Sequence, residues 1–296
     1  MENRIEAKLE FYCNAVVGEG PVWDEMESLL YWVDILTNKL CVYNPLNKSN
    51  LSFDVGSHLG TMALCEDGRV ILAKQDGFYF FDIKSGQCEL IVDPEKYLPN
   101  NRFNDGKCSP AGEFWAGTLA YDLKEGAASL YSLGPDRRVK VKIEGVTLSN
   151  GLAWNQSADK FYFIDSEAQK IFSYDYDSNG DLTNMSVLRE VERTEGIPDG
   201  MTIDTEGFLW VALFNGSKVI RLDPQTGKTV FTIDLPVSKV TSCAFGGANL
   251  DELYITTANQ GLTVEDIEKQ PLAGSLFKVK VPFQGLPFFR YKPGRK

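Results

Sequence analysis

Residues 28–34 read SLLYWVD, a short apolar run that begins at a turn and ends at an aspartate. Five stretches of the same character follow: DGRVILA (67–73), GEFWAGT (112–118), DKFYFID (159–165), GFLWVAL (207–213) and DELYITT (251–257). Their central residues, from Tyr31 to Tyr254, are separated by 40, 44, 47, 48 and 44 residues. Aromatic and aliphatic runs of this kind favour strands, and a repeat of about 45 residues is typical of β-propeller blades.

Two further strand-like segments recur in phase with these runs. One follows each run after about ten residues, for example QKIFSYDYDSNG (169–180), and one rich in small residues precedes it, for example NGLAWNQ (150–156). The variable span before the next repeat supplies a fourth, outer strand. We therefore predict an all-β, six-bladed β-propeller with four-stranded antiparallel blades, in which residues 1–296 form a single domain. The N-terminal run 7–13 is expected to pair into the last blade and close the ring, and 264–270 is the one expected helical turn.

Charge and composition exclude several classes of function. The chain has 30 Lys and Arg against 41 Asp and Glu, a net charge of −11. This balance argues against nucleic acid and against an anionic membrane surface as partners. The single histidine, His58, excludes zinc sites built from several histidines and hydrolases built on a histidine dyad. As a lone histidine just before an inner strand, His58 is interpreted as a hydrogen-bonded structural residue that could also face the channel.

The six cysteines contain no C-x-x-C pair and are read as free thiols of a reducing compartment. The first residues, MENRIEAKLE, show no apolar signal region, and no apolar run approaches the ~20 residues of a membrane helix. We therefore expect a cytoplasmic monomer. Trp23, Trp115, Trp154 and Trp210 are expected in the blade cores. Phe288 and Phe289 are expected to pack on the last blade or to be loosely held.

Polar residues recur at the turns that lead into the inner strands. Because the inner strands of a propeller line its channel, these turns converge on one mouth, and they carry Glu19-Gly20, Asp105-Gly106, Asn150-Gly151 and Asp199-Gly200. Facing carboxylates would destabilise one another unless a cation were bound between them. Donors that are all oxygen select a hard ion such as Ca²⁺, Mg²⁺ or Mn²⁺, and Zn²⁺ can occupy such sites. The alternative is that these pairs only form turns and that their glycines serve the backbone.

Four motifs carry a resemblance to a known family: GEGPVW (18–23), NRFNDGK (101–107), SNGLAW (149–154) and IPDGMTID (197–204). They resemble the regucalcin (senescence marker protein)/gluconolactonase family, which also contains luciferin-regenerating enzyme. Two long segments, 209–228 and 240–258, are similar to the same family, so the resemblance covers essentially the whole chain. It implies a six-bladed propeller with one divalent metal ion near the channel mouth.

The resemblance also implies roles for individual residues. Glu19, Asn150 and Asp199 take the positions of the family's metal ligands, and Arg102 and Asn104 those of residues that bind substrate hydroxyls. In AGTLAYDLKEG (116–126), Asp122 takes the place where we expect a further acidic substrate residue, a glutamate in vertebrate relatives. The segment after Asp122 is also shorter, which leaves the substrate range open.

The implied function is metal-dependent hydrolysis of sugar lactones such as glucono-1,5-lactone, a gluconolactonase activity. Ca²⁺ is the first expectation for the ion, with Zn²⁺, Mn²⁺ and Mg²⁺ as alternatives. Asp199 is either the base that takes a proton from the attacking water or a metal ligand alone. Two other functions stay open: another small-molecule hydrolase of the luciferin-regenerating or organophosphate type, and a non-enzymatic calcium-binding regulator or binding platform.

Overall fold

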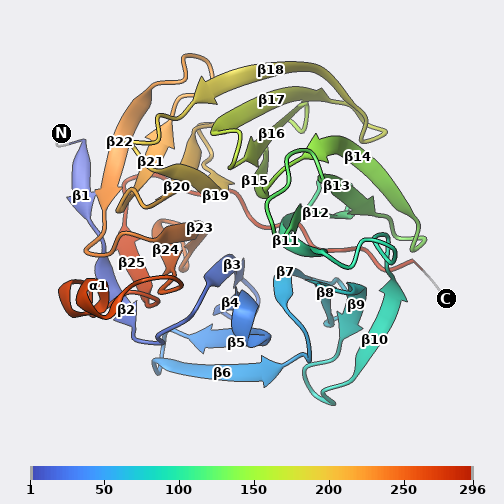
Figure 1. Ribbon diagram of the computed structural model, residues 1–296, viewed down its shortest axis with the longest axis horizontal. Coiled ribbons are helices and arrows are strands. Elements are labelled where there is room, and N and C mark those ends of the chain that lie inside the picture. Colours follow the sequence, from blue (N-terminus) through green and yellow to red (C-terminus); the bar gives the residue numbers. More distant parts are fainter. Residues whose placement is uncertain (1–2, 295–296) are drawn as a thin grey trace.

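The structure is a computed structural model that describes residues 3–294. Its strands form six sheets arranged as a ring around a central axis (Figure 1). Each sheet contains four antiparallel strands in the order expected from the repeats, and one sheet gains a fifth strand. The predicted six-bladed β-propeller is therefore confirmed. Blades are numbered 1 to 6 in the order in which their innermost strands occur along the chain.

The two inner strands of each blade are the two segments that recur most regularly in the repeat. The small-residue segment forms the innermost strand, and the apolar run forms the second strand. The innermost strands are β3 (Gly18–Asp24), β7 (Leu59–Leu64), β11 (Asn101–Cys108), β15 (Ser149–Trp154), β19 (Ile197–Ile203) and β23 (Val240–Gly246). The second strands are β4 (Leu29–Asp34), β8 (Val70–Lys74), β12 (Phe114–Ala120), β16 (Lys160–Asp165), β20 (Leu209–Phe214) and β24 (Glu252–Thr257).

The outer positions hold strands that are partly exposed. The third strands are β5 (Lys39–Asn44), β9 (Gly77–Phe81), β13 (Ala128–Leu133), β17 (Lys170–Tyr176), β21 (Lys218–Leu222) and β25 (Leu276–Lys280). The outermost strands are β6 (Ser49–Asp54), β10 (Cys88–Val92), β14 (Val139–Val146), β18 (Leu182–Glu190), β22 (Thr229–Asp234) and, in blade 6, β2 (Lys8–Phe11). A 3₁₀ turn, η1 (Ile35–Thr37), follows β4, and the expected helix is α1 (Val264–Lys269).

The hydrophobic core lies between neighbouring blades, because side chains of a flat four-stranded sheet are buried only where the next sheet covers them. Trp115 and Trp210 are fully buried on second strands, and Trp23 and Trp154 are buried on inner strands, as predicted. Every residue of β3 is buried, since this strand packs on its own blade and on both neighbours. Burial of this kind leaves the ends of the inner strands as the places where polar groups can gather.

The N-terminal segment closes the ring as predicted. β2 pairs antiparallel with β25, with Leu9 opposite Phe277, and so becomes the outer strand of blade 6. The preceding strand, β1 (Arg4–Glu6), was not predicted; it pairs parallel with β22 and adds a fifth strand to blade 5. An ion pair between Arg4 and Asp234 supports this pairing. The first described residues therefore link blades 5 and 6.

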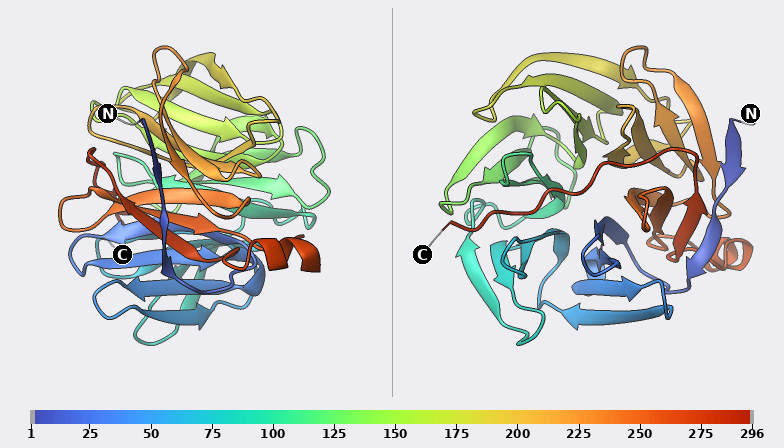
Figure 2. Two further views of the ribbon diagram at one scale, coloured as in Figure 1. Left: turned by 90° about the vertical axis from the view of Figure 1, so that its left-hand side faces the viewer. Right: turned by 180° about the vertical axis from the view of Figure 1, so that it is seen from behind.

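The C-terminal strap, residues 282–294, crosses the face of the ring where the inner strands end (Figure 2, right). Arg290 forms a 2.6 Å ion pair with the buried Asp24 of blade 1, and the Tyr291 hydroxyl donates a 2.8 Å hydrogen bond to the Gly134 carbonyl of blade 3. Phe288 packs against a hydrophobic cluster that contains Tyr254 and Leu276 of blade 6, as expected. It also lines a small cavity together with Lys107 of blade 3, because the strap continues past blade 6 over the other blades.

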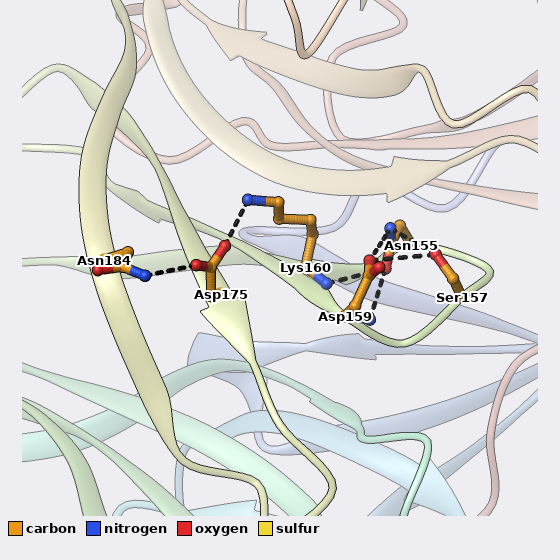
Figure 3. Close-up of polar contacts among 6 residues, drawn as sticks. All are labelled: Asn155, Ser157, Asp159, Lys160, Asp175 and Asn184. Atoms are coloured by element: carbon orange, nitrogen blue, oxygen red, sulfur yellow. Dashed lines mark hydrogen bonds and ion pairs between the residues drawn. The ribbon is translucent and has the colours of Figure 1, made fainter.

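Blade 4 carries polar contacts that extend from the turn between β15 and β16 to β18 (Figure 3). The turn between β15 and β16 is held by Asn155, whose amide donates a 2.7 Å hydrogen bond to Asp159. Across β16, β17 and β18, Asp175 accepts a 2.6 Å hydrogen bond from Asn184 and pairs with Lys160. Exposed pairs of this kind contribute little to stability. Among residues 3–294, no helix is long and apolar enough to cross a lipid bilayer.

Candidate metal centre and substrate cavity

A cavity of about 340 Å³ lies at the mouth of the channel where the inner strands begin. This volume is at the lower end of the range for small-molecule sites. Its polar floor contains Glu19, Arg102, Asn104, Asn150 and Asp199, and Ser166, Glu167, Thr241 and Gln260 add further polar lining. Its apolar rim consists of Val17, Ile35, Leu36, Leu119, Leu123, Leu148, Ile197 and Phe214. The structure thus brings five of the six predicted site residues together, from blades 1, 3, 4 and 5.

Irregular register at the start of each inner strand helps to aim the floor residues. The pairing of β3 with β4 shifts between Glu19 and Val22, and that of β15 with β16 shifts between Asn150 and Leu152. The same irregularity occurs in the inner strands of the other four blades. A bulge increases the local twist and breaks the strict alternation of side chains, so a polar side chain can turn toward the axis.

Two glycines of the acid-glycine and amide-glycine pairs lie against the next blade. A Cβ atom on Gly151 would lie 2.8 Å from the carbonyl oxygen of Asp199, and one on Gly200 would lie 2.1 Å from the Ser242 hydroxyl. Both contacts are with the next blade. Gly151 and Gly200 therefore allow adjacent inner strands to pack closely, whereas Gly20 has a φ of +52°, a backbone conformation that favours glycine.

The buried carboxylates of the floor influence one another. Glu19 and Asp199 are 5% and 9% exposed. Burial raises the pKa of Glu19 well above its usual range, and the charges of Asp199 and Asp105 raise it further. Burial also raises the pKa of Asp199, with Asp105 as the second cause. Without a compensating positive charge, this arrangement favours protonated carboxyl groups, so it is suited to a bound cation.

Asp105 lies between the two ends of the channel and does not line the cavity, although the sequence placed it among the converging groups. Its carboxylate accepts a 2.7 Å hydrogen bond from the Gly106 N–H. Burial raises the pKa of Asp105, and the Lys107 ammonium opposes that rise. Lys107 itself donates a 2.8 Å hydrogen bond to the Met201 carbonyl. The positive charge of Lys107 therefore favours the ionised form of Asp105 behind the floor.

A chain of hydrogen bonds joins the amides of the floor across three blades. Arg102 donates to Asn104 Oδ1 (2.9 Å), and Asn104 Nδ2 donates to Asn150 Oδ1 (2.9 Å). Asn150 Nδ2 then donates to the Ser166 hydroxyl (2.8 Å), which donates to the Pro198 carbonyl next to Asp199 (2.5 Å). Both N–H groups of Asn104 are used, since Nδ2 also donates to the Ser149 carbonyl (2.9 Å). The network fixes the orientation of each amide.

Arg102 has a donor without a partner. Its Nε atom is buried and makes no hydrogen bond with any described residue. Burial lowers the pKa of Arg102 to about 10, and the hydroxyl of Tyr121 and the charge of Glu19 oppose that shift. The guanidinium therefore keeps its positive charge at neutral pH. A buried donor without a partner is unfavourable, so a ligand oxygen near Nε would relieve this cost.

The donor atoms of the floor fit a hard cation. Glu19, Asp199 and Asn150 offer carboxylate and amide oxygens. Asn150 Oδ1 accepts one hydrogen bond from Asn104, which leaves its second lone pair for a cation. No group of three or more His, Cys, Asp or Glu side chains within residues 3–294 has the arrangement of a metal site. The candidate set contains two carboxylates and takes its third donor from an amide. Oxygen donors of this kind are those preferred by Ca²⁺ and Mg²⁺.

Asp122 does not line the cavity. It is exposed, and its carboxylate accepts a 3.4 Å hydrogen bond from the Lys124 N–H within its own turn. Leu119, Tyr121 and Leu123 line the cavity instead. Side chains two residues apart share a side of a strand, so the alternation beyond β12 could have identified Tyr121 from the sequence. A role of Asp122 in substrate binding stays a prediction that this geometry does not favour.

His58 lies beside the cavity rather than in it. Its Nδ1 atom is 2.6 Å from the hydroxyl oxygen of Tyr121, and the two rings are 5.9 Å apart in an edge-to-face arrangement. This contact agrees with its interpretation as a hydrogen-bonded residue. The repeat pattern does not indicate this partner, because His58 and Tyr121 belong to different blades.

Comparison with known proteins gives one consistent family. The family described as SMP-30/Gluconolactonase/LRE-like region matches residues 17–259. A putative sugar lactone lactonase, YvrE, of Bacillus subtilis is 41% identical over 289 residues, covering 96% of this chain and 99% of its own. Regucalcin of Oryctolagus cuniculus is 40% identical over 295 residues, covering 97% and 98%. Among solved structures, a luciferin-regenerating enzyme superposes with a TM-score of 0.90 at 33% identity, covering 97% and 99%.

Proposed function

The chain belongs to the SMP-30/gluconolactonase/LRE-like family, and from this premise we propose that it hydrolyses sugar lactones with the help of one divalent metal ion. The ion is held by Glu19, Asn150 and Asp199, with Ca²⁺ as the first expectation and Zn²⁺, Mn²⁺ or Mg²⁺ as alternatives. A cation at this position polarises a lactone carbonyl and stabilises the negative charge that develops on its oxygen.

One observation carries the proposal. Three oxygen-bearing side chains from three blades, Glu19, Asn150 and Asp199, line the same cavity. They come from positions 131 and 49 residues apart in the chain (150 − 19 and 199 − 150), so the fold alone assembles them. The Bacillus relative, which is named a putative sugar lactone lactonase, supports lactones as the substrate class.

The remaining floor residues bind and orient the substrate. Arg102 offers its unpartnered Nε donor to a substrate oxygen. Asn104 has both N–H groups engaged, so it contacts a substrate hydroxyl through the second lone pair of Oδ1. In the base role, Asp199 takes a proton from the water that attacks the carbonyl. Burial raises the pKa of Asp199, which makes its carboxylate a stronger base than an exposed aspartate.

The first experiment measures turnover of D-glucono-1,5-lactone by metal-stripped protein, before and after addition of Ca²⁺, Mg²⁺, Mn²⁺ or Zn²⁺. We expect turnover that depends on the cation and that falls by at least about a hundredfold in Asp199→Asn. Asp181→Asn is a matched control, because Asp181 is exposed on the turn between β17 and β18 and does not line the cavity.

Cation binding is measured alongside by titration calorimetry. An Asp199→Asn protein that still binds the ion but does not turn over supports the base role, whereas loss of both supports a ligand role. If wild-type protein binds a cation tightly but hydrolyses no sugar lactone, the lactonase proposal is wrong. Two hypotheses would then remain: another hydrolase reaction, of the luciferin-regenerating or organophosphate type, and calcium binding without catalysis.

We also propose that the protein is a cytoplasmic monomer with no nucleic-acid or membrane partner. The net charge of −11 supports the absence of these two anionic partners. Light scattering after gel filtration should give a mass near 33.0 kDa. A mass of twice this value at micromolar concentration would contradict the monomer.

A further inference from the structure

Most polar side chains that line the cavity already use their hydrogen-bonding groups within the protein. The Ser166 hydroxyl and the Thr241 hydroxyl each donate to a backbone carbonyl, and both N–H groups of Asn104 are engaged. Apart from the candidate cation ligands, three lining side chains keep a free group within residues 3–294: the Nε donor of Arg102, the side-chain amide of Gln260 and the carboxylate of Glu167. Glu167 is the charged acceptor among them.

The backbone fixes Glu167 at the edge of the cavity. It lies in the tight turn between β16 and β17, which is closed by a 3.1 Å hydrogen bond from the Gln169 N–H to the Ser166 carbonyl. The Asp165 carboxylate accepts hydrogen bonds of 2.9 and 3.1 Å from the backbone N–H groups of residues 147–148, at the entry to β15. The turn that carries Glu167 is therefore tied to the inner strand of its own blade.

The Glu167 carboxylate is half-buried and available to a ligand. Its side chain is 30% exposed, and its nearest cation is Arg193 Nη2 at 3.7 Å, which is too long for a hydrogen bond. Because the Arg193 side chain is 65% exposed, this ion pair is weak. Both carboxylate oxygens can then accept hydrogen bonds from hydroxyl groups, and bonds to an ionised acceptor are stronger than neutral ones.

Glu167 is also connected to the floor where the cation is expected. It directly follows Ser166, whose hydroxyl accepts a 2.8 Å hydrogen bond from Asn150. The cavity volume of about 340 Å³ is small, so a monosaccharide lactone bound at the floor also reaches the lining on blade 4. The hydroxyl groups of such a ligand find an acceptor in Glu167 and a donor in Arg102 Nε, while its C–H groups lie against the apolar rim.

We propose that Glu167 is a specificity-determining residue of the site, and that its carboxylate accepts hydrogen bonds from the hydroxyl groups of a sugar lactone. This inference rests on the proposed lactonase function and names the residue that selects polyhydroxylated substrates. It assigns the acidic substrate contact to blade 4. The resemblance instead implies Asp122 of blade 3, which is exposed and does not line the cavity.

The test compares two six-membered lactones, D-glucono-1,5-lactone and δ-valerolactone, which has the same ring without hydroxyl groups. Glu167→Ala should lower kcat/KM for gluconolactone by about tenfold to a hundredfold, mainly through a higher KM, because a hydrogen bond to a charged group is lost. The value for δ-valerolactone should change by less than about twofold, since this lactone has no hydroxyl to lose a partner. Glu167→Gln should have an intermediate effect, because its amide oxygen still accepts.

Two measurements separate substrate recognition from other effects of the charge. The affinity for Ca²⁺, measured by titration calorimetry, should be the same in Glu167→Ala and in wild-type protein. Glu192→Ala is the matched control, because Glu192 is exposed in the loop between β18 and β19 and does not line the cavity. This variant should keep the wild-type kcat/KM for both lactones.

Asp122→Ala tests the competing assignment. We expect it to leave the preference for gluconolactone over δ-valerolactone unchanged. A loss of this preference in Asp122→Ala, with a wild-type preference in Glu167→Ala, would overturn the inference. An equal loss on both lactones in Glu167→Ala would also overturn it, and both results would leave the lactonase function intact. Hydrolysis of neither lactone by the wild-type protein would overturn the proposed function, and this inference with it.

Discussion

Asn104 Nδ2 donates a 2.9 Å hydrogen bond to Asn150 Oδ1, and this bond crosses from blade 3 to blade 4 at the floor of the cavity. It joins a residue expected to bind substrate to one expected to bind the metal ion. The two parts of the site are therefore coupled, and a change in Asn104 will also affect the orientation of Asn150.

We predict that Asn104→Leu lowers the free energy of unfolding by about 1–3 kcal/mol, because the Ser149 carbonyl and Asn150 Oδ1 lose their donor while they stay buried. Urea unfolding measures this value. Asn100→Leu is the control, since Asn100 is exposed, and it should change the free energy by no more than about 0.5 kcal/mol. Equal effects of the two variants would show that the network has no structural role.

Stabilisation by a divalent cation should increase with pH. Burial raises the pKa of both Glu19 and Asp199 above the values of exposed carboxyl groups. In metal-free protein, their contribution to stability is therefore full below the unfolded pKa and is lost as pH rises through the folded pKa. A cation binds the deprotonated groups and reverses this loss.

The expected result is that the rise in Tm on addition of Ca²⁺ is small at pH 5 and grows toward pH 8, measured by calorimetry in matched buffers. Asp199→Asn should flatten the dependence, because it removes one of the two titrating groups. A rise in Tm that is the same at every pH would contradict the participation of these carboxylates.

Loss of the strap ion pair should destabilise the ring. Arg290→Ala removes the partner of Asp24, which is 6% exposed, and we expect a loss of about 1.5–3 kcal/mol in urea unfolding. Arg138→Ala is the matched control, because its pair with Asp136 is exposed and at 3.6 Å. Its loss should be below about 1 kcal/mol. If Arg290→Ala lowered the free energy of unfolding no more than Arg138→Ala, the ion pair between the strap and blade 1 would not stabilise the ring.

Residues 1–296 should unfold as one domain. The N-terminal strands link blades 5 and 6, and the C-terminal strap bonds to blades 1 and 3. No blade can then separate without breaking contacts of the others. Scanning calorimetry should give one transition whose calorimetric and van't Hoff enthalpies agree. Two resolved transitions would contradict a single domain.

Much of the fold could be predicted from the sequence, because a propeller repeats one local pattern of strands in every blade. The run around Tyr31 and its five counterparts identify second strands, and the phase of their neighbours identifies the other strands of each blade. Glu19, Asn150 and Asp199 were predicted to meet for the same reason, since equivalent positions of a closed ring face one axis. The parallel strand β1 carries no such signal, because its partner β22 lies more than 200 residues away.

The sequence by itself therefore determined the ring, its closure by the N-terminal strand, and the set of polar residues at one mouth of the channel. Tertiary structure decided which neighbours of those residues take part. It placed Asp105 behind the floor with Lys107, turned Asp122 to solvent, and brought Tyr121 to the cavity against His58. The physical reason is that a bulge or a turn shifts a side chain by one position, and contacts between blades depend on that shift, which a repeat pattern does not encode.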